Sequence, residues 1–207
     1  MAKAWINSVQ SSGQLTVFAG PGFTGGMWAT VLKDAIVAFN NLMTAKGVKL
    51  KLTTTTKKPS ESGGADINLE AVASKASFSY GGAQYSKTFD GNGLHGSTLP
   101  VEVEQSGKSS GIEKAFVFVP QTPRKAEKAR QVGAKVREFI LVHELVHAAG
   151  LSNDDHTLDD VLCFPAELQE GRTAADDRLH PWGGLAGNMP PYILSNKTLK
   201  KLQSIWP

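Results

Sequence analysis

The sequence predicts an α+β fold with a twisted mixed β-sheet, a long helix in the N-terminal half, a central helix, and a small irregular C-terminal lobe that ends in a helix. Patterns typical of a strand, a helix and a second strand follow one another between residues 15 and 52. A continuous apolar run at 115–119 is typical of a strand covered on both faces. A second long helical pattern ends at Gly150, after which Pro, Gly and Asp become frequent.

The length of 207 residues fits one domain, with 1–150 forming the sheet and central helix and 151–207 forming the smaller lobe. Apolar residues make up 41% and charged residues 20%, which excludes a chain that is disordered or fibrous throughout. The net charge of +3 does not indicate a nucleic-acid-binding protein. Cys163 is the one cysteine, so no intrachain disulfide can form.

The N-terminal region contains no apolar core of the kind found in signal peptides. The most apolar early stretch, 18–39, includes Lys33 and Asp34 and does not have the pattern of a membrane span. We therefore expect a cytoplasmic monomer that binds neither membrane nor nucleic acid. Release from the cell at a later stage stays open.

The elements before the central helix follow from periodicity. Apolar residues recur at threes and fours over 28–46, which predicts a helix that ends at Gly47. The Gly and Ser residues of 74–111 indicate hairpins and surface loops. Four segments have strand patterns, at 15–19, 48–52, around 66–69 and 115–119.

Thr122 and Pro123 have the pattern of a helix start, because a hydroxyl cap and a first-turn proline are both favoured there. We expect this central helix to run to Ala149. Its first half carries six Lys and Arg residues, which we interpret as a solvated face, because Glu127 and Glu138 interrupt the charge. A short amphipathic helix at 195–205 completes the prediction, with Ser195 or Asn196 as its cap.

The segment His143-Glu144-Leu145-Val146-His147 lies within the central helix. Four residues are about one helical turn, so both imidazoles project from one face and can bind one metal ion. Glu144 is then placed to take a proton from water at that ion. The histidines continue the apolar stripe of Val136 and Ile140, so they lie on the buried face of the helix. Burial of two histidines and a glutamate is costly unless these polar groups are compensated, and a divalent cation can compensate them. The alternative is that both histidines are hydrogen-bonded core residues.

The motif from His143 to Gly150 resembles that of the metzincin clan of zinc endopeptidases, in which the helix ends at the glycine. Residues 187–192, Gly-Asn-Met-Pro-Pro-Tyr, resemble the Met-turn of this clan, with Met189 beneath the metal. The segment 194–206 is similar to the C-terminal helix of matrixins. The resemblance implies a metzincin-like fold and Zn²⁺-dependent cleavage of peptide bonds. The specific match is confined to 143–150 and 187–206.

The resemblance also implies roles for individual residues. Glu144 would be the general base, and Tyr192 would help to stabilise the oxyanion. A protein or peptide substrate would lie extended along an exposed strand edge, for which the residues around Ile67 are the candidate.

This chain departs from the clan at the third metal ligand, which is expected six residues after His147. That position is Asn153, a poor zinc ligand. We expect His156, three residues further on, to be the third ligand together with His143 and His147. Other candidates for this third position are Asp154, Asp155 and His180.

Asn153 leaves two further functions open. The first is a catalytically inactive, zinc-stabilised binding or structural protein on a peptidase fold. The second is a zinc hydrolase of a non-peptide amide, because the same activated water serves both reactions.

Overall fold

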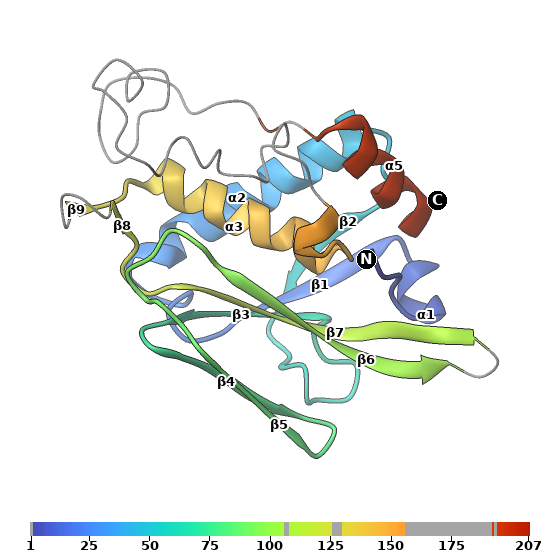
Figure 1. The fold of residues 1–207 in the computed structure, drawn as a ribbon, viewed down its shortest axis with the longest axis horizontal. Coiled ribbons are helices and arrows are strands. Elements are labelled where there is room, and N and C mark those ends of the chain that lie inside the picture. Colours follow the sequence, from blue (N-terminus) through green and yellow to red (C-terminus); the bar gives the residue numbers. More distant parts are fainter. Residues whose placement is uncertain (1, 106–107, 126–129, 156–191, 193) are drawn as a thin grey trace.

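The computed structural model of the chain describes residues 2–105, 108–125, 130–155, 192 and 194–207. A twisted, mostly parallel sheet lies at the centre, with the strand order β2-β1-β3-β7-β6 (Figure 1). Its first four strands are parallel, and β6 is antiparallel to β7 at the edge. The bounds are β1 Gln14–Ala19, β2 Lys51–Thr55, β3 Ile67–Val72, β6 Ser97–Gln105 and β7 Lys108–Pro120.

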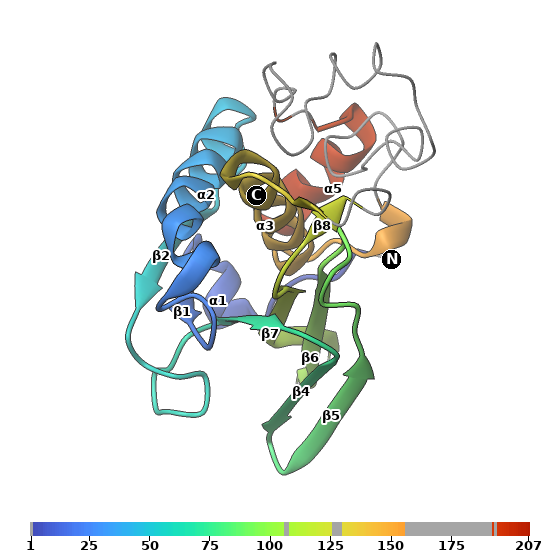
Figure 2. The same ribbon diagram turned by 90° about the vertical axis from the view of Figure 1, so that its left-hand side faces the viewer.

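Helices and a hairpin lie on opposite faces of this sheet (Figures 1 and 2). The helical side holds α2 (Gly26–Ala45), α3 (Ala134–Ala148) and α5 (Asn196–Ile205). The other side holds the hairpin of β4 (Lys75–Tyr80) and β5 (Ala83–Thr88). Short elements complete the described chain, with α1 at Asn7–Gln10, β8 at Arg124–Lys125, β9 at Arg130–Gln131 and η1 at Asn153–Asp155.

The predicted first helix is confirmed, including its end. The N–H groups of Gly47 and Val48 donate to the carbonyls of Thr44 and Met43, at 3.1 and 2.9 Å. A helix can end with these two bonds only if the residue after its last turn adopts a left-handed backbone conformation. Gly47 does so, with a φ of 65°. The helix therefore ends where the sequence predicts, and the chain turns directly toward β2.

Two apolar cores result from the layers. The larger lies between the sheet and the helices, where buried residues of α2 and α3 pack on β1, β3 and β7. The smaller lies beneath the hairpin and is aromatic. Phe78 stacks on Phe116 of β7 and on Tyr85 of β5, with ring centroids 3.6 and 4.6 Å apart. Residues 115–119 are buried, so β7 is covered on both faces as predicted.

The predicted start of the central helix at Thr122 and Pro123 is wrong. In the structure β8 and β9 pair antiparallel, and α3 begins only at Ala134. The reason is tertiary, because the N–H of Arg124 donates to the carbonyl of Asn92, and that of Val132 to Pro123, both through the backbone. These bonds replace the first helical turns in the described residues, so Arg124, Lys125 and Arg130 of the expected basic face lie in short strands, while Lys135 and Arg137 lie in α3.

The second strand is shifted from its predicted position at 48–52 to Lys51–Thr55. The N–H of Val48 is used at the end of α2, and the N–H of Leu50 donates to Val48, so the chain joins the ladder later. The predicted alternation of burial is nevertheless present, because Val48, Leu50 and Leu52 are all buried. In the described part of the chain, no helix has the length and apolarity to cross a membrane.

Candidate functional site

The C-terminal half of α3 carries the motif and is almost wholly buried. Val136 and Ile140 pack into the larger core, and His147 continues that face with 8% of its surface exposed. The helix ends at Ala148, and Gly150 follows with a φ of 115°. A Cβ at Gly150 would overlap the carbonyl oxygen of Lys3, so only glycine fits this turn.

The segment of Lys3 and Trp5 holds this end of α3. The indole N–H of Trp5 donates to the carbonyl of Ala148 at 2.9 Å. The backbone N–H of Lys3 donates to Gly150 at 2.8 Å. The last carbonyls of a helix have no partner within it, so these bonds satisfy groups that would otherwise be buried without one. The backbone that carries His147 is thereby fixed.

The imidazoles of His143 and His147 converge. Their Nε2 atoms lie 3.0 Å apart, and the ring planes cross at 69°. Nδ1 of His147 lies 3.0 Å from the carbonyl oxygen of Leu151, which can accept a hydrogen bond from Nδ1–H. Nε2 of His147 then carries a lone pair, which lies within hydrogen-bond distance of Nε2 of His143 and would be directed to a metal bound between the two rings. Two nitrogens bound to one tetrahedral zinc are ~3.3 Å apart, given Zn–N bonds of ~2.0–2.1 Å. The pair therefore fits a zinc ion after a small adjustment.

The structure leaves the third ligand open. Within the described ranges, no group of three or more His, Cys, Asp or Glu side chains could hold a metal. His156 and His180, together with Met189, lie outside the described residues. Asp154 is exposed in η1 and lines the same cleft as His147, so it stays a candidate.

Asp155 is engaged elsewhere, which removes it from the candidate ligands. Its carboxylate accepts the N–H and hydroxyl of Ser152 at 2.8 and 2.7 Å, and the ammonium of Lys201 at 2.6 Å. Burial tends to raise the pKa of Asp155, but the bonds from Lys201 and Ser152 prevail and hold it at about 2. Asp155 thus joins η1 to α5 as a charged anchor.

Glu144 is buried next to the histidine pair, with Oε1 3.9 Å from Nε2 of His143. The Thr98 hydroxyl donates to Oε2 at 2.7 Å. A Cβ at Gly96 would overlap the side chain of Glu144, so the glycine makes room for the carboxylate. Burial raises the pKa of Glu144 to about 7, against the lowering effect of the Thr98 bond, the charge of Lys87 and a backbone bond from Gly96.

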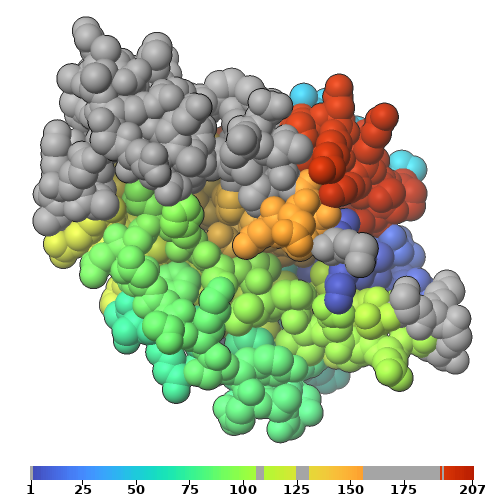
Figure 3. Space-filling model, viewed as in Figure 1, coloured from blue at the N-terminus to red at the C-terminus, as the bar shows by residue number. Residues whose placement is uncertain are grey.

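A cleft of about 530 Å³ opens over Glu144 and His147. One wall is the start of β6, including Thr98 and Pro100, and the other is the chain from the end of α3 to η1. Figure 3 shows these two walls, coloured green and orange, side by side on one face of the molecule. The buried carboxylate and one imidazole therefore lie between a strand edge and a loop.

The exposed strand edge is β6, not the strand of Ile67. Ile67 belongs to β3, which pairs with β1 on one side and β7 on the other, so our expectation of an edge there is wrong. No described strand pairs with the outer side of β6. The N–H of Ala115 in β7 donates to Asp66, away from β6. Pro100 lies opposite Ala115, so Pro100 and Thr98 direct their backbone groups outward.

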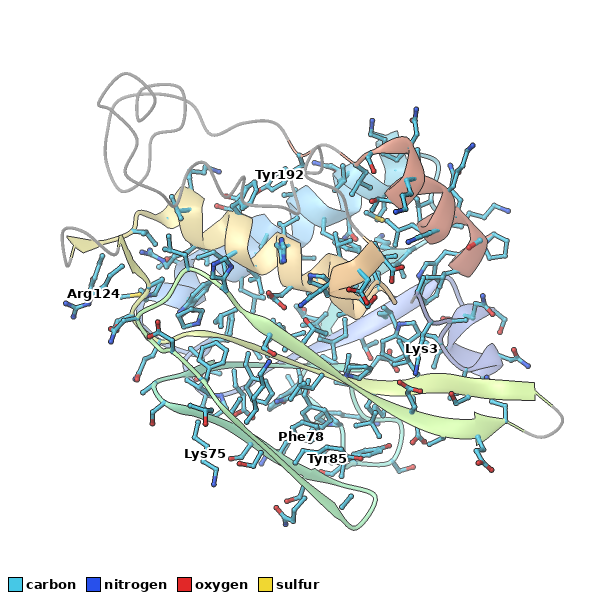
Figure 4. All side chains as sticks on the ribbon, in the orientation of Figure 1. Lys3, Lys75, Phe78, Tyr85, Arg124 and Tyr192 are labelled. Atoms are coloured by element: carbon cyan, nitrogen blue, oxygen red, sulfur yellow. The ribbon has the colours of Figure 1, made fainter. Side chains whose placement is uncertain are left out.

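Tyr192 lies against α3 on the side away from the sheet (Figure 4). Its hydroxyl donates to Oε1 of Glu138 at 3.0 Å, and its ring stacks on Phe139 with centroids 5.9 Å apart. Burial and the nearby charge of Glu138 raise its pKa well above the usual range. In this arrangement the hydroxyl contacts Glu138 and not the histidine pair, so the oxyanion role stays a prediction.

The sequence alone did not reveal three residues of the site, Thr98, Gly96 and Lys87. Thr98 and Gly96 reach Glu144 only because β6 packs against α3, and Lys87 reaches the cleft from the hairpin. The one local signal was the glycine-rich stretch that ends at Gly96, which indicates a turn but no partner. No protein-family model matches the sequence, and comparison with curated proteins gives no match.

Proposed function

We propose that the protein is a zinc-dependent metallopeptidase in which His143 and His147 hold the metal and Glu144 is the general base. The observation that carries the proposal is the convergence of two imidazole Nε2 atoms beside a buried carboxylate, of which the carboxylate and His147 line a cleft along a free strand edge. His156 is the proposed third ligand, with Asp154 and His180 as alternatives. The mixed sheet, the long α2 and the central α3 support a metzincin-like fold.

A zinc ion at this site supplies Lewis acidity, which activates water near neutral pH and polarises a carbonyl group. The residues of the chain supply the proton transfer. Thr98 and Gly96 hold the carboxylate of Glu144 on the β6 side, while Oε1 lies 3.9 Å from Nε2 of His143. Glu144 accepts a proton from the attacking water and passes it to the leaving amine nitrogen.

The edge of β6 is the proposed binding place for the substrate backbone. An extended peptide can add to β6 by pairing with the outward N–H and C=O of Thr98 and the outward C=O of Pro100. Pro100 has no N–H, so the added strand receives one hydrogen bond fewer at that point. This pairing places a scissile carbonyl over Glu144 and His147.

The test combines metal content with a matched pair of variants. We expect about one zinc per chain by elemental mass spectrometry, and cleavage of unfolded casein. Glu144→Gln should keep the zinc and lose turnover by ~10²–10⁴-fold, the usual contribution of a general base. Glu104→Gln removes the same charge from an exposed position of β6 and should cleave at the wild-type rate. Normal turnover by Glu144→Gln would refute the proposal.

Two other outcomes correspond to the alternative functions. Zinc at full occupancy without cleavage of any protein supports an inactive, zinc-stabilised protein. Hydrolysis of small acyl amides with no cleavage of peptides supports a hydrolase of non-peptide amides.

A further inference from the structure

Lys87 brings a positive charge into the cleft from a different layer of the fold. It lies in β5, on the hairpin that covers the opposite face of the sheet. Its ammonium nevertheless donates to the hydroxyl of Ser97, at the start of β6, at 3.1 Å. It lines the cleft together with Thr98, Glu144 and His147. A hairpin residue is thus part of the wall beside the proposed reacting centre.

Lys87 forms no close ion pair with a described carboxylate, although its charge acts on Glu144 from a greater distance. The other cleft lysine, Lys3, pairs with Glu102. No carboxylate of the described residues lies within 4.0 Å of Lys87, whose hydrogen bond goes to the neutral hydroxyl of Ser97. A lysine in a cleft with only a hydroxyl partner can accept a carboxylate from a ligand without first breaking an ion pair.

The other charged side chains that line the cleft are the Lys3–Glu102 ion pair, Glu144 and Asp154. Lys87 lies on the β6 wall, and Asp154 lies on the η1 wall. The Asp154 carboxylate repels an anionic group that approaches its wall, while Lys87 attracts one. Among the lining side chains, Lys87 is the cation without a close ion pair, and low-dielectric walls concentrate its field, so an anionic group that enters the cleft is attracted toward Lys87.

We propose that Lys87 is a specificity-determining residue that binds a carboxylate of the substrate beside the bond to be cleaved. This inference rests on the proposed peptidase function. The carboxylate comes either from an acidic side chain of the peptide or from its free C-terminus. Both present the same group to the ammonium, and the experiment below separates them.

The experiment measures binding rather than turnover, so that it does not depend on catalysis. Zinc-loaded Glu144→Gln protein is titrated with fluorescent Ala/Ser peptides in which one Glu or one Gln is moved from position to position. A second pair of peptides lacks Glu and differs only in a free or an amidated C-terminus. We expect the carboxylate member of one pair to bind ~3–10-fold more tightly, as a partly exposed charge-assisted hydrogen bond supplies.

Variants in the same background attribute the preference to Lys87. Lys87→Met should abolish it, Lys87→Arg should keep it, and Lys87→Glu should favour a peptide with Lys over the Glu peptide. Lys75→Met is the matched control, because Lys75 is an exposed lysine on the neighbouring strand of the same hairpin and does not line the cleft (Figure 4). It should bind the peptides as the parent does.

The outcomes separate this inference from the proposed function. Equal binding of the charged and neutral peptides, absence of binding to either, or a preference that survives Lys87→Met would each overturn the role of Lys87. If the Lys87-dependent preference is present but the wild-type protein cleaves no peptide, the inference stands and the peptidase function fails. If the wild-type protein cleaves peptides without regard to charge, only the inference fails.

Discussion

Trp5 and Trp206 donate their indole N–H groups to two consecutive carbonyls, those of Ala148 and Ala149, both at 2.9 Å. All four residues are buried. Residues close to the two ends of the described chain therefore converge on the same end of α3, one and two residues beyond His147. The histidine pair is thus supported by segments far from it in sequence.

We predict that Trp5→Phe and Trp206→Phe each lower the free energy of unfolding by ~1–3 kcal/mol, because a buried carbonyl loses its donor. Both should also weaken zinc binding, since the end of α3 is less well held. Trp28→Phe is the control, because its indole N–H donates to Pro120 at 2.8 Å, away from the histidines. It should lose similar stability in urea but bind zinc normally. Equal zinc affinity in all three variants would contradict the prediction.

A methyl group at Gly96 should displace the side chain of Glu144, the proposed general base. The Cβ of Gly96→Ala would overlap Glu144, so we expect a loss of ~1–3 kcal/mol in stability from overpacking. Turnover should fall sharply, while the zinc content stays unchanged. Gly25→Ser provides the comparison, because a Cβ there meets nothing within 4 Å and serine is a favoured helix cap. A Gly96→Ala protein with full turnover would show that Glu144 tolerates the shift.

Thr98 should act as a positioning residue through Glu144. Thr98→Val keeps the shape of the side chain but removes the 2.7 Å bond to Oε2. A misplaced catalytic group commonly costs up to ~10²-fold, so we expect kcat to fall ~10–100-fold with little change in KM. Thr98→Ser retains the hydroxyl and should recover most of the activity. A change in KM alone would indicate that Thr98 contributes to substrate binding instead.

Asp155→Asn should destabilise the protein by ~1–3 kcal/mol at neutral pH, because bonds from Lys201 and Ser152 lose their charged acceptor. The folded-state pKa of Asp155 is about 2, below the ordinary value of ~3.9, so its stabilising effect is present above ~3.9 and disappears as the pH falls through about 2. Denaturation of both proteins as a function of pH measures this difference. Asp34→Asn, at an exposed position, should show no comparable loss.

Alanine substitutions can identify the third ligand. His143→Ala and His147→Ala should both lose zinc, and of the three candidates we expect His156→Ala to do so as well. Unchanged affinity in His156→Ala would direct attention to Asp154 or His180. His95→Ala is the control, since His95 is exposed and carries no motif. Competition with a fluorescent zinc chelator gives the affinities.

The sequence predicts the motif helix well because its information is local. The spacing of His143 and His147 is one helical turn, and the structure places their Nε2 atoms together. The end of α2 at Gly47 was likewise predictable, because a helix end depends on a few neighbouring residues. Both features need no knowledge of the rest of the chain.

Features that depend on distant segments could not be predicted in this way. The start of the central helix was misplaced because Arg124 bonds to Asn92, a contact that no local pattern reveals. The edge strand was misplaced because sheet order depends on how β3 and β7 pair, not on the residues around Ile67. The same holds for Thr98, whose hydroxyl reaches Glu144 only after β6 has docked on α3.

Pro100 also affects how one molecule meets another of its own kind. An exposed edge strand is a template for association with a second copy. Two β6 strands laid edge to edge would each bring a proline without an N–H to the junction, so both sides of the ladder would lack a donor. A peptide strand without proline that pairs with β6 lacks only the one hydrogen bond that Pro100 cannot donate. On this ground the edge of β6 pairs less well with its own copy than with a strand that has no proline.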